Sequence, residues 1–327
     1  METEKQRMGS GKIILCLIGA ALVLAAPFLA PTQYISNLFC LSLINIIVVL
    51  GLNFITGLAG NMNLGTAGIF AIGAYSSALL STKLGVSPWI GLIVAAILGI
   101  VIGLCLGFPS LRVKGVYLSL TTIAFGEIVR LWLNNTKNIT NGTAGVVAIP
   151  KYNIGGFFFD TDQSCYYLIL FFVIVFTLIS VRLVNSKWGR AFKALSDNPD
   201  AAESLGIDIA KIKITAFTLT TVFGSIAGAL YAHYVSYIDP MTFNFNWSVK
   251  YVIMLMIGGI GLIRGNVFGA VVCTLLPEAL RVFGDYYLII YYVIAFAAAI
   301  VLPNGWLVGI EKLCRWIIGK VKRVRSA

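Results

Sequence analysis

Long apolar stretches follow one another along almost the whole chain, separated by short turns rich in glycine, proline or charge. A helix crosses the hydrocarbon core of a bilayer with roughly 17 to 25 mostly apolar residues. The spacing of apolar runs and breaks therefore predicts ten membrane-spanning helices. They lie near residues 13–30, 34–57, 65–82, 88–108, 116–133, 166–184, 213–235, 249–263, 266–282 and 287–302.

Two features of this pattern leave the number of spans between eight and ten. The runs 249–263 and 266–282 are short and meet at "GGIGLIRGN", so they could form a re-entrant hairpin instead of two spans. The run 13–30 follows three basic residues, as a signal peptide does, but it contains no A-x-A cleavage triplet. We therefore expect it to be the first span.

The composition supports the same class of protein. Hydrophobic residues make up 59% of the 327 residues and charged residues 11%, whereas soluble domains carry about 25% charged residues. The mean hydropathy is +0.91. The sequence thus predicts an all-α, polytopic transmembrane helix bundle, with residues 1–327 as a single integral membrane domain. The six cysteines are scattered without metal-ligand spacing and are expected to be small buried hydrophobes, so no metal or other cofactor is expected.

The net charge of +11 indicates an orientation in the membrane and not a nucleic-acid partner, because the basic residues lie in short links and in the C-terminal tail. Cytoplasmic links carry the excess of lysine and arginine. Eighteen of the 24 fall on the side of the N-terminus. We therefore expect residues 1–12, 185–212 and 303–327 to be cytoplasmic and 134–165 to be an extracytoplasmic loop.

Glycines at four-residue spacing predict where helices pack tightly, since small residues one turn apart let two backbones approach closely in lipid. Such spacing occurs at Gly99, Gly103 and Gly107, at Gly224 and Gly228, and at Gly261, Gly265 and Gly269.

The stretch "TGLAGNMNLGTAGIFAIGAY", residues 56–75, is unusually rich in glycine, asparagine and threonine for a membrane segment. A broken or re-entrant segment that lines a polar cavity would use such residues, because their side chains satisfy the freed backbone groups. We place part of a transport pathway here. An ordinary short cytoplasmic turn is the alternative.

Carboxylates are scarce within the predicted spans, and each has an arginine three residues further on. Glu127 with Arg130 and Glu278 with Arg281 would share a helix face, so we interpret them as structural ion pairs rather than as a proton relay. His233 lies near the outer end of its span, where we expect an interfacial histidine.

Residues 189–208, "GRAFKALSDNPDAAESLGID", form a charged stretch in this apolar chain. Asn198 can cap a helix of two turns, Pro199 suits its first position, and Gly206 can end it in left-handed geometry. Because so short a helix is only marginally stable by itself in water, it must pack on the preceding "GRAFKAL" segment or on another subunit. Ala194, Ala201 and Ala202 are expected to be exposed and to allow a close approach by a partner.

The chain contains no G-x-x-x-x-G-K-[ST] loop for a nucleotide phosphate and no obvious carboxylate network for ion coupling. The energy for transport would then come from a separate ATP-hydrolysing subunit that docks on this cytoplasmic stretch.

At these residues the chain resembles the LivM-type permease subunits of bacterial branched-chain amino acid ABC transporters. The resemblance rests on "GRAFKALSDNPDAAESLGIDIAKIKITAF" with the later "AGALYA", and on "GLAGNMNLGTAGIFAIGAY", "GGIGLIRGNVFGA" and "LPNGWLVG" in the same order. It implies a non-enzymatic, multi-pass subunit of the bacterial inner membrane. The implied partners are a second, related permease, two cytoplasmic ABC ATPases and a periplasmic or extracellular substrate-binding protein, with leucine, isoleucine and valine as cargo.

The resemblance also implies roles for two sets of residues. The surface that receives the ATPase would comprise Gly189, Arg190, Ala194, Asp197, Ala202 and Gly206. The pathway would be lined by Asn61, Asn63, Gly65 and Gly68. Asp197 departs from the glutamate expected at this position, which puts the fine docking geometry in question. Two alternatives stay open: a permease of the same superfamily that imports urea, short amides or a sugar, and an ion-coupled secondary transporter.

Overall fold

The computed structural model describes residues 32–113, 115–154 and 156–301, with residues 24, 27, 305, 306 and 309. The predicted first span, the N-terminal 12 residues and the basic tail lie essentially outside these residues. The described chain is a helix bundle, which confirms the all-α class; its strands are the short antiparallel pair β1 (Asn153–Ile154) and β2 (Phe157–Phe158).

The helices are α2 (Gln33–Leu52) with the π-helical extension η1 (Asn53–Leu58), α3 (Thr66–Lys83), α4 (Pro88–Ser110), α5 (Val116–Asn135), α6 (Lys137–Thr140), η2 (Gly142–Ala144), α7 (Asp162–Val184), α8 (Lys187–Asp197), α9 (Pro199–Ser204), α10 (Ile209–Val235), α11 (Phe245–Gly258), α12 (Ile263–Ala279), η3 (Leu280–Tyr286) and α13 (Tyr287–Val301).

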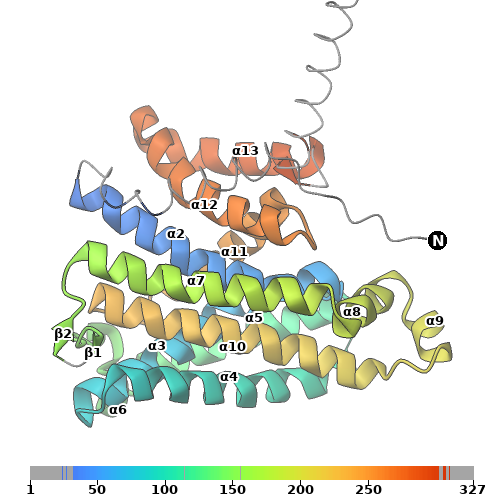
Figure 1. Cartoon of the computed structure of the whole chain (residues 1–327), viewed down its shortest axis with the longest axis horizontal. Helices are drawn as coiled ribbons and strands as arrows, with labels where there is room; N and C mark the ends of the chain where they lie inside the picture. The colour runs from blue at the N-terminus through green and yellow to red at the C-terminus, as the bar shows by residue number, and fades with distance from the viewer. Residues whose placement is uncertain are drawn as a thin grey trace, which may run out of the picture.

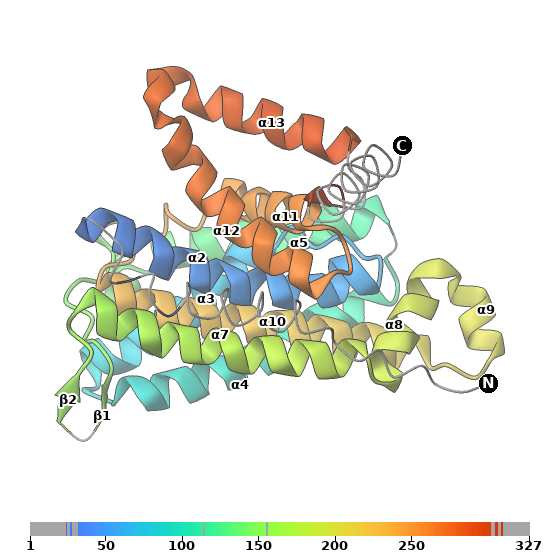
Figure 2. The same ribbon diagram turned by 45° about the horizontal axis from the view of Figure 1, so that its top comes forward.

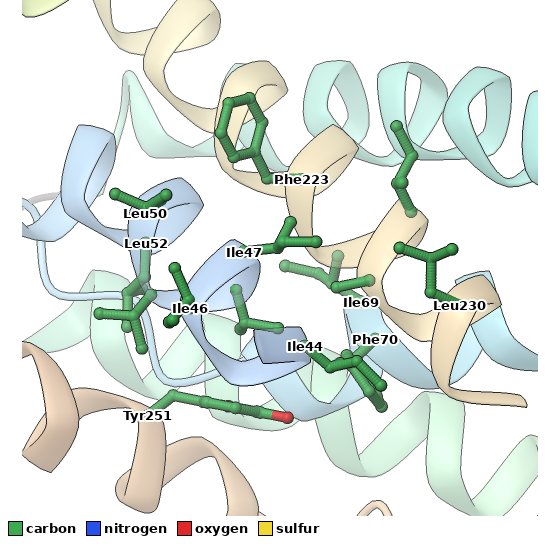
Figure 3. Packing of buried hydrophobic residues seen from close by; sticks show 14 of the residues in the cluster. Ile44, Ile46, Ile47, Leu50, Leu52, Ile69, Phe70, Phe223, Leu230 and Tyr251 are labelled. Carbon is green, nitrogen blue, oxygen red and sulfur yellow. The ribbon is translucent and has the colours of Figure 1, made fainter. Parts of the chain in front are cut away.

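The helix α10 is the centre of the bundle and packs on α4, α3 and α2, while α2 also packs on α7, α11 and α12. The long helices run side by side, with α8 and α9 at one end and α6, β1 and β2 at the other (Figure 1). The buried core lies where α2, α3, α10 and α11 converge, around Ile47, Phe70, Phe223 and Tyr251 (Figure 3). The segments that the sequence predicts to be cytoplasmic and extracytoplasmic are thus held at opposite ends.

Six helices of the described chain are long and apolar enough to cross a membrane. They are Gln33–Leu58, Pro88–Ser110, Val116–Asn135, Asp162–Val184, Ile209–Val235 and the kinked Ile263–Ala297. The six are fewer than the ten predicted spans, although every predicted span after the first has a helix at its place. The helix α3 has the length but not the hydropathy, because glycine, serine and threonine replace larger apolar residues along it.

The three C-terminal runs behave differently from simple spans. The helix α11 has 14 residues, and at 1.5 Å per residue it rises only about 21 Å, less than a hydrocarbon core of about 30 Å. This favours the re-entrant hairpin over a span for α11. Gly284 has a φ of +58° and interrupts the helical path between α12 and α13. The helix α13 therefore folds back from the end of α12 (Figure 2).

The glycine ladders form the predicted close helix contacts. A Cβ atom on Gly99 would lie 2.9 Å from the Cα of Val222, and one on Gly107 3.1 Å from the Cα of Ile214, so α4 lies directly on α10. Gly228 of α10 similarly touches the backbone of Phe70 in α3. In the third ladder Gly265 and Gly269 pack α12 on α11, whereas Gly261 lies in the turn between them.

Candidate functional site

The helix formed by α2 and η1 stops at Leu58, and α3 begins only at Thr66. Between them the chain turns at Gly60, which has a φ of +67°. Asn61 stabilises the turn, because its backbone N–H donates to the carbonyl of Ile55 (2.9 Å) and its side-chain amide donates to that of Ala59 (2.9 Å). The predicted break within residues 56–75 is therefore present.

The N-terminus of α3 is buried in the bundle, and other helices supply acceptors for its free N–H groups. The N–H of Leu64 donates to Thr122 Oγ1 of α5 (3.1 Å), and the N–H of Ala67 donates to Ser248 Oγ of α11 (2.9 Å). Asn63 Oδ1 accepts from the N–H of Gly65 (2.9 Å). The first turn of a helix needs such partners when water is excluded. The break is therefore an interruption inside the bundle whose N–H groups are hydrogen-bonded, and not an ordinary exposed turn.

The four predicted pathway residues occupy different positions in this break. Asn61 is partly exposed, whereas Asn63, Gly65 and Gly68 are buried. A Cβ atom on Gly68 would lie 2.7 Å from the Cα of Gly126, and one on Gly65 would meet the carbonyl of Thr122. In this conformation the two glycines hold α3 against α5.

The charged stretch at residues 189–208 folds as two short helices joined at Asn198, which accepts a hydrogen bond from the N–H of Ala201 (3.1 Å). Pro199 takes the first position of α9, as predicted, and Gly206 adopts a φ of +79° directly after that helix. Ser186 and Asp208 cap α8 and α10 in the same way. The local sequence signals thus give the correct boundaries.

The helix α9 packs on α8, the segment that precedes it, and α8 packs on the bundle. Phe192 is fully buried, with its ring 6.3 Å from that of Phe54 in η1. The sequence left two supports open for the short helix α9, the preceding segment of the chain or another subunit. The structure shows that α9 packs on the preceding segment. A movement of α8 would therefore be transmitted to η1.

The six predicted coupling residues divide between the surface and the interior. Arg190, Asp197 and Gly206 are exposed and Ala194 is partly exposed. Gly189 is buried, because it touches the backbone of Val184. The expectation that Ala202 is exposed is wrong: its side chain is 2% exposed, since this face of α9 turns inward. Ala201 on the opposite face is exposed.

One cavity of about 720 Å³ joins the break to the charged stretch at residues 189–208. Gly60 and Asn61 line it from the break, and Asp200, Glu203 and Gly206 line it from α9 and the turn after it. Ser196, at the end of α8, also lines it and lies against Gly60. Sequence reasoning missed Gly60 and Ser196, although the glycine in "LAGN" is a signal for a turn.

Comparison with known proteins decides the family. The family described as "Branched-chain amino acid transport system / permease component" matches residues 34–302. The chain belongs to this family. It is 35% identical to the high-affinity branched-chain amino acid transport system permease protein LivM of Escherichia coli (strain K12), over 82% of this chain and 68% of the relative. No solved structure matches the chain significantly.

Other relatives extend the comparison. The permease is 28% identical to the probable LivM of Methanocaldococcus jannaschii, over 74% of this chain and 71% of the relative. It is also 24% identical to the permease protein LivH of Escherichia coli (strain K12), over 79% and 89% of the two chains. The relatives are transport permease subunits, and the names of LivM and LivH refer to the same transport system. With six helices of membrane-spanning length among its described residues, this permease is a multi-pass membrane protein.

Both predicted charge pairs of the permease are formed. Arg130 lies 2.8 Å from Glu127 on α5, and both side chains are partly exposed. Arg281 lies 3.5 Å from Glu278 at the end of α12, where Tyr34 also donates a hydrogen bond to Glu278 Oε2 (2.5 Å). Among the described residues, no three His, Cys, Asp or Glu side chains are grouped to hold a metal ion.

His233, two residues before the end of α10, is 1% exposed. Its Nδ1 lies 2.6 Å from the carbonyl oxygen of Pro150, which only accepts, so Nδ1 carries the hydrogen of the neutral ring. Nε2 then accepts from Ser77 Oγ at 2.7 Å. The ring also packs on Tyr152, whose pKa is raised by burial. His233 thus joins the loop that carries Pro150 and Tyr152 to α10 and α3.

Proposed function

We propose that this chain is the permease subunit of an ABC importer for branched-chain amino acids in the bacterial inner membrane. Its cargo is leucine, isoleucine or valine, as the names of the LivM relatives suggest. The permease itself hydrolyses nothing. Two cytoplasmic ABC ATPases supply the energy, a LivH-like permease completes the pathway, and an extracytoplasmic binding protein delivers the substrate.

The cavity shared by the break and the α8–α9 stretch is the observation that carries this mechanism. An ATPase that docks on α9 would displace α8, and Ser196 would press on Gly60 at the base of α3. Because N–H groups at the start of α3 donate hydrogen bonds to Thr122 of α5 and Ser248 of α11, a small displacement of this end of α3 would break and remake those bonds. Asn61 and the buried Asn63, Gly65 and Gly68 would then border the opened pathway.

Acidic residues at the mouth of the cavity suit a basic docking segment. Asp200, Glu203 and Asp208 line it and are exposed. Arg190, Ala194, Asp197 and Gly206 complete the docking surface from outside. Of the two buried members of the set, Gly189 lets α8 lie close to Val184 at the end of α7, and Ala202 lies on the inward face of α9.

The orientation implied by this mechanism has the termini, α8 and α9 in the cytoplasm. Cysteines introduced at Asp200 and Glu203 test it, because both side chains are exposed and lie outside the predicted spans. A membrane-impermeant maleimide should label them in inside-out vesicles and leave them unlabelled in intact spheroplasts. Labelling of spheroplasts alone would place the docking surface on the wrong side and refute the mechanism.

Co-purification in mild detergent, followed by mass spectrometry, tests the assembly. The permease should bring with it a second permease and an ABC ATPase. Reconstituted with the binding protein, the complex should import leucine only with ATP. Uptake by the purified chain alone under a proton or sodium gradient would instead establish a secondary transporter.

A different cargo is the second candidate, and one relative favours it. The chain is 26% identical, over 54% of its length, to a nucleoside ABC transporter permease protein of Lactococcus lactis. Competition of labelled leucine uptake by valine, isoleucine, urea and nucleosides separates the two candidates. Inhibition by the branched-chain amino acids alone supports the proposed cargo.

A further inference from the structure

A second cavity, of about 660 Å³, lies at the end of the bundle opposite to α8 and α9, between the start of α2, α11 and the end of α12 with η3. Figure 1 shows the start of α2 and the end of α12 on this side of the bundle. The volume falls within the range of small-molecule sites, about 300 to 1,000 Å³. In the proposed orientation this end faces the binding protein.

Four charged side chains of both signs line the cavity: Lys250, Glu278, Arg281 and Asp285. Glu278 and Arg281 are paired with each other and with Tyr34. The side chains of Lys250 and Asp285 form no hydrogen bond or ion pair with any other described residue. Lys250 is partly buried, and a partly buried charge without a counter-charge is unfavourable. The ammonium group of Lys250 and the carboxylate of Asp285 could therefore each bind a charged group of a ligand in this cavity.

The remaining wall of the cavity combines polar and apolar residues. Leu38, Pro277 and Tyr287 contribute apolar surface between the charged groups. A ligand that suits all of these groups is small and carries an anionic group, an ammonium group and an apolar side chain.

We propose that this cavity binds a free α-amino acid as it is handed over to the permease, with its carboxylate on Lys250 and its ammonium group on Asp285. The apolar side chain would lie against Leu38 and Tyr287. This inference rests on the proposed function, since it concerns the cargo of the same importer. The ethanolamine head group of a phospholipid presents a similar pair of charges and is the other source of this chemistry.

Photo-leucine, a diazirine analogue of leucine, tests the site in the assembled complex in phosphatidylcholine nanodiscs. Irradiation should label peptides around Lys250 or Asp285. Leucine should compete with this labelling, whereas leucinamide and isocaproate, which each lack one charge, should compete about tenfold less well or worse, as the loss of a charge-assisted hydrogen bond predicts. Equal competition by all three would overturn the proposal.

Variants locate the two contacts. Lys250→Met and Asp285→Asn should each reduce the labelling about tenfold, and Lys250→Arg should retain most of it. Lys83→Met is the matched control, because Lys83 is exposed, donates to the Asn138 carbonyl (2.9 Å) and does not line the cavity. Unchanged labelling in Lys250→Met and Asp285→Asn would refute the assignment.

Further results distinguish failure of the proposed amino-acid site from failure of the proposed function. Labelling that disappears when phosphatidylethanolamine replaces phosphatidylcholine would reassign the cavity to a lipid head group and overturn the proposal. ATP-dependent leucine uptake by a wild-type complex whose cavity is not labelled would refute this site and leave the proposed function intact. A complex that imports no branched-chain amino acid would refute the proposed function itself.

Discussion

Gly60, in the break between α2 and α3, lies against Ser196 at the end of α8: a Cβ atom on Gly60 would be 2.6 Å from Ser196 Oγ. This contact joins the segment beside the pathway to the segment proposed to receive the ATPase. Gly60→Ala should therefore reduce leucine uptake about fivefold or more while ATP hydrolysis continues, since a coupling free energy of about 1 kcal/mol has this effect.

Gly85→Ala is the control for backbone strain in this experiment. Gly85 has a φ of +63°, close to the +67° of Gly60, but no atom lies within 4 Å of its Cβ position. Both variants carry a left-handed penalty of about 1 to 2 kcal/mol, so only the contact with Ser196 distinguishes them. Equal uptake by the two variants would show that the contact transmits nothing.

The second prediction concerns the packing of α4 on α10. A Cβ atom on Gly103 would lie 2.5 Å from the Cα of Thr218, so Gly103→Leu forces two backbones apart. Overpacking of this kind costs about 1 to 3 kcal/mol or more. The thermal unfolding midpoint in detergent should fall, whereas Cys105→Leu, on the exposed face of the same helix, should leave it unchanged. A similar fall in both variants would contradict a specific glycine contact.

The features that the sequence predicts correctly depend on neighbouring residues. Apolar runs predict the helices, and Asn198, Pro199 and Gly206 predict the ends of α9, because caps and left-handed turns are local. The four-residue glycine spacing predicts close packing without naming the partner helix. The break in residues 56–75 is visible because its polar residues do not suit lipid.

The features that the sequence misses depend on which segments meet in space. Ala202 is buried because it lies on the inward face of α9, and His233 is buried beneath the loop that carries Pro150 and Tyr152. Neither is encoded in local spacing. The contact of Gly60 with Ser196 likewise depends on η1 and α8 meeting in space, where the rings of Phe54 and Phe192 also pack together.

The third prediction follows from the two hydrogen bonds of His233. His233→Ala removes the ring and leaves Ser77 Oγ and the Pro150 carbonyl without their partners, which should lower the free energy of unfolding by about 1 to 3 kcal/mol. Ser77→Ala should cost less, because the ring keeps its bond to Pro150. The double variant should cost less than the sum of the two single changes, measured by unfolding of the complex. Simple additivity would mean that the two side chains do not interact.

The fourth prediction concerns Glu127 and Arg130, which pair at 2.8 Å on α5. If the pair is structural, either Glu127→Gln or Arg130→Gln leaves one charge unpaired in a membrane helix, which is costly. The double variant removes both charges and should be more stable than either single variant. Both side chains are partly exposed. If water reaches them, the free energies of unfolding of the double and single variants should differ by about 1 kcal/mol or less.

Transport measurements separate this role from proton coupling. A proton relay through Glu127 would make Glu127→Gln inactive and would leave the double variant equally inactive, because the titrating carboxyl is absent from both. A structural pair predicts that the double variant recovers leucine uptake, and that uptake in proteoliposomes depends on ATP but not on an imposed pH gradient. The 2.8 Å ion pair between Arg130 and Glu127 is the observation that favours the structural role over the relay.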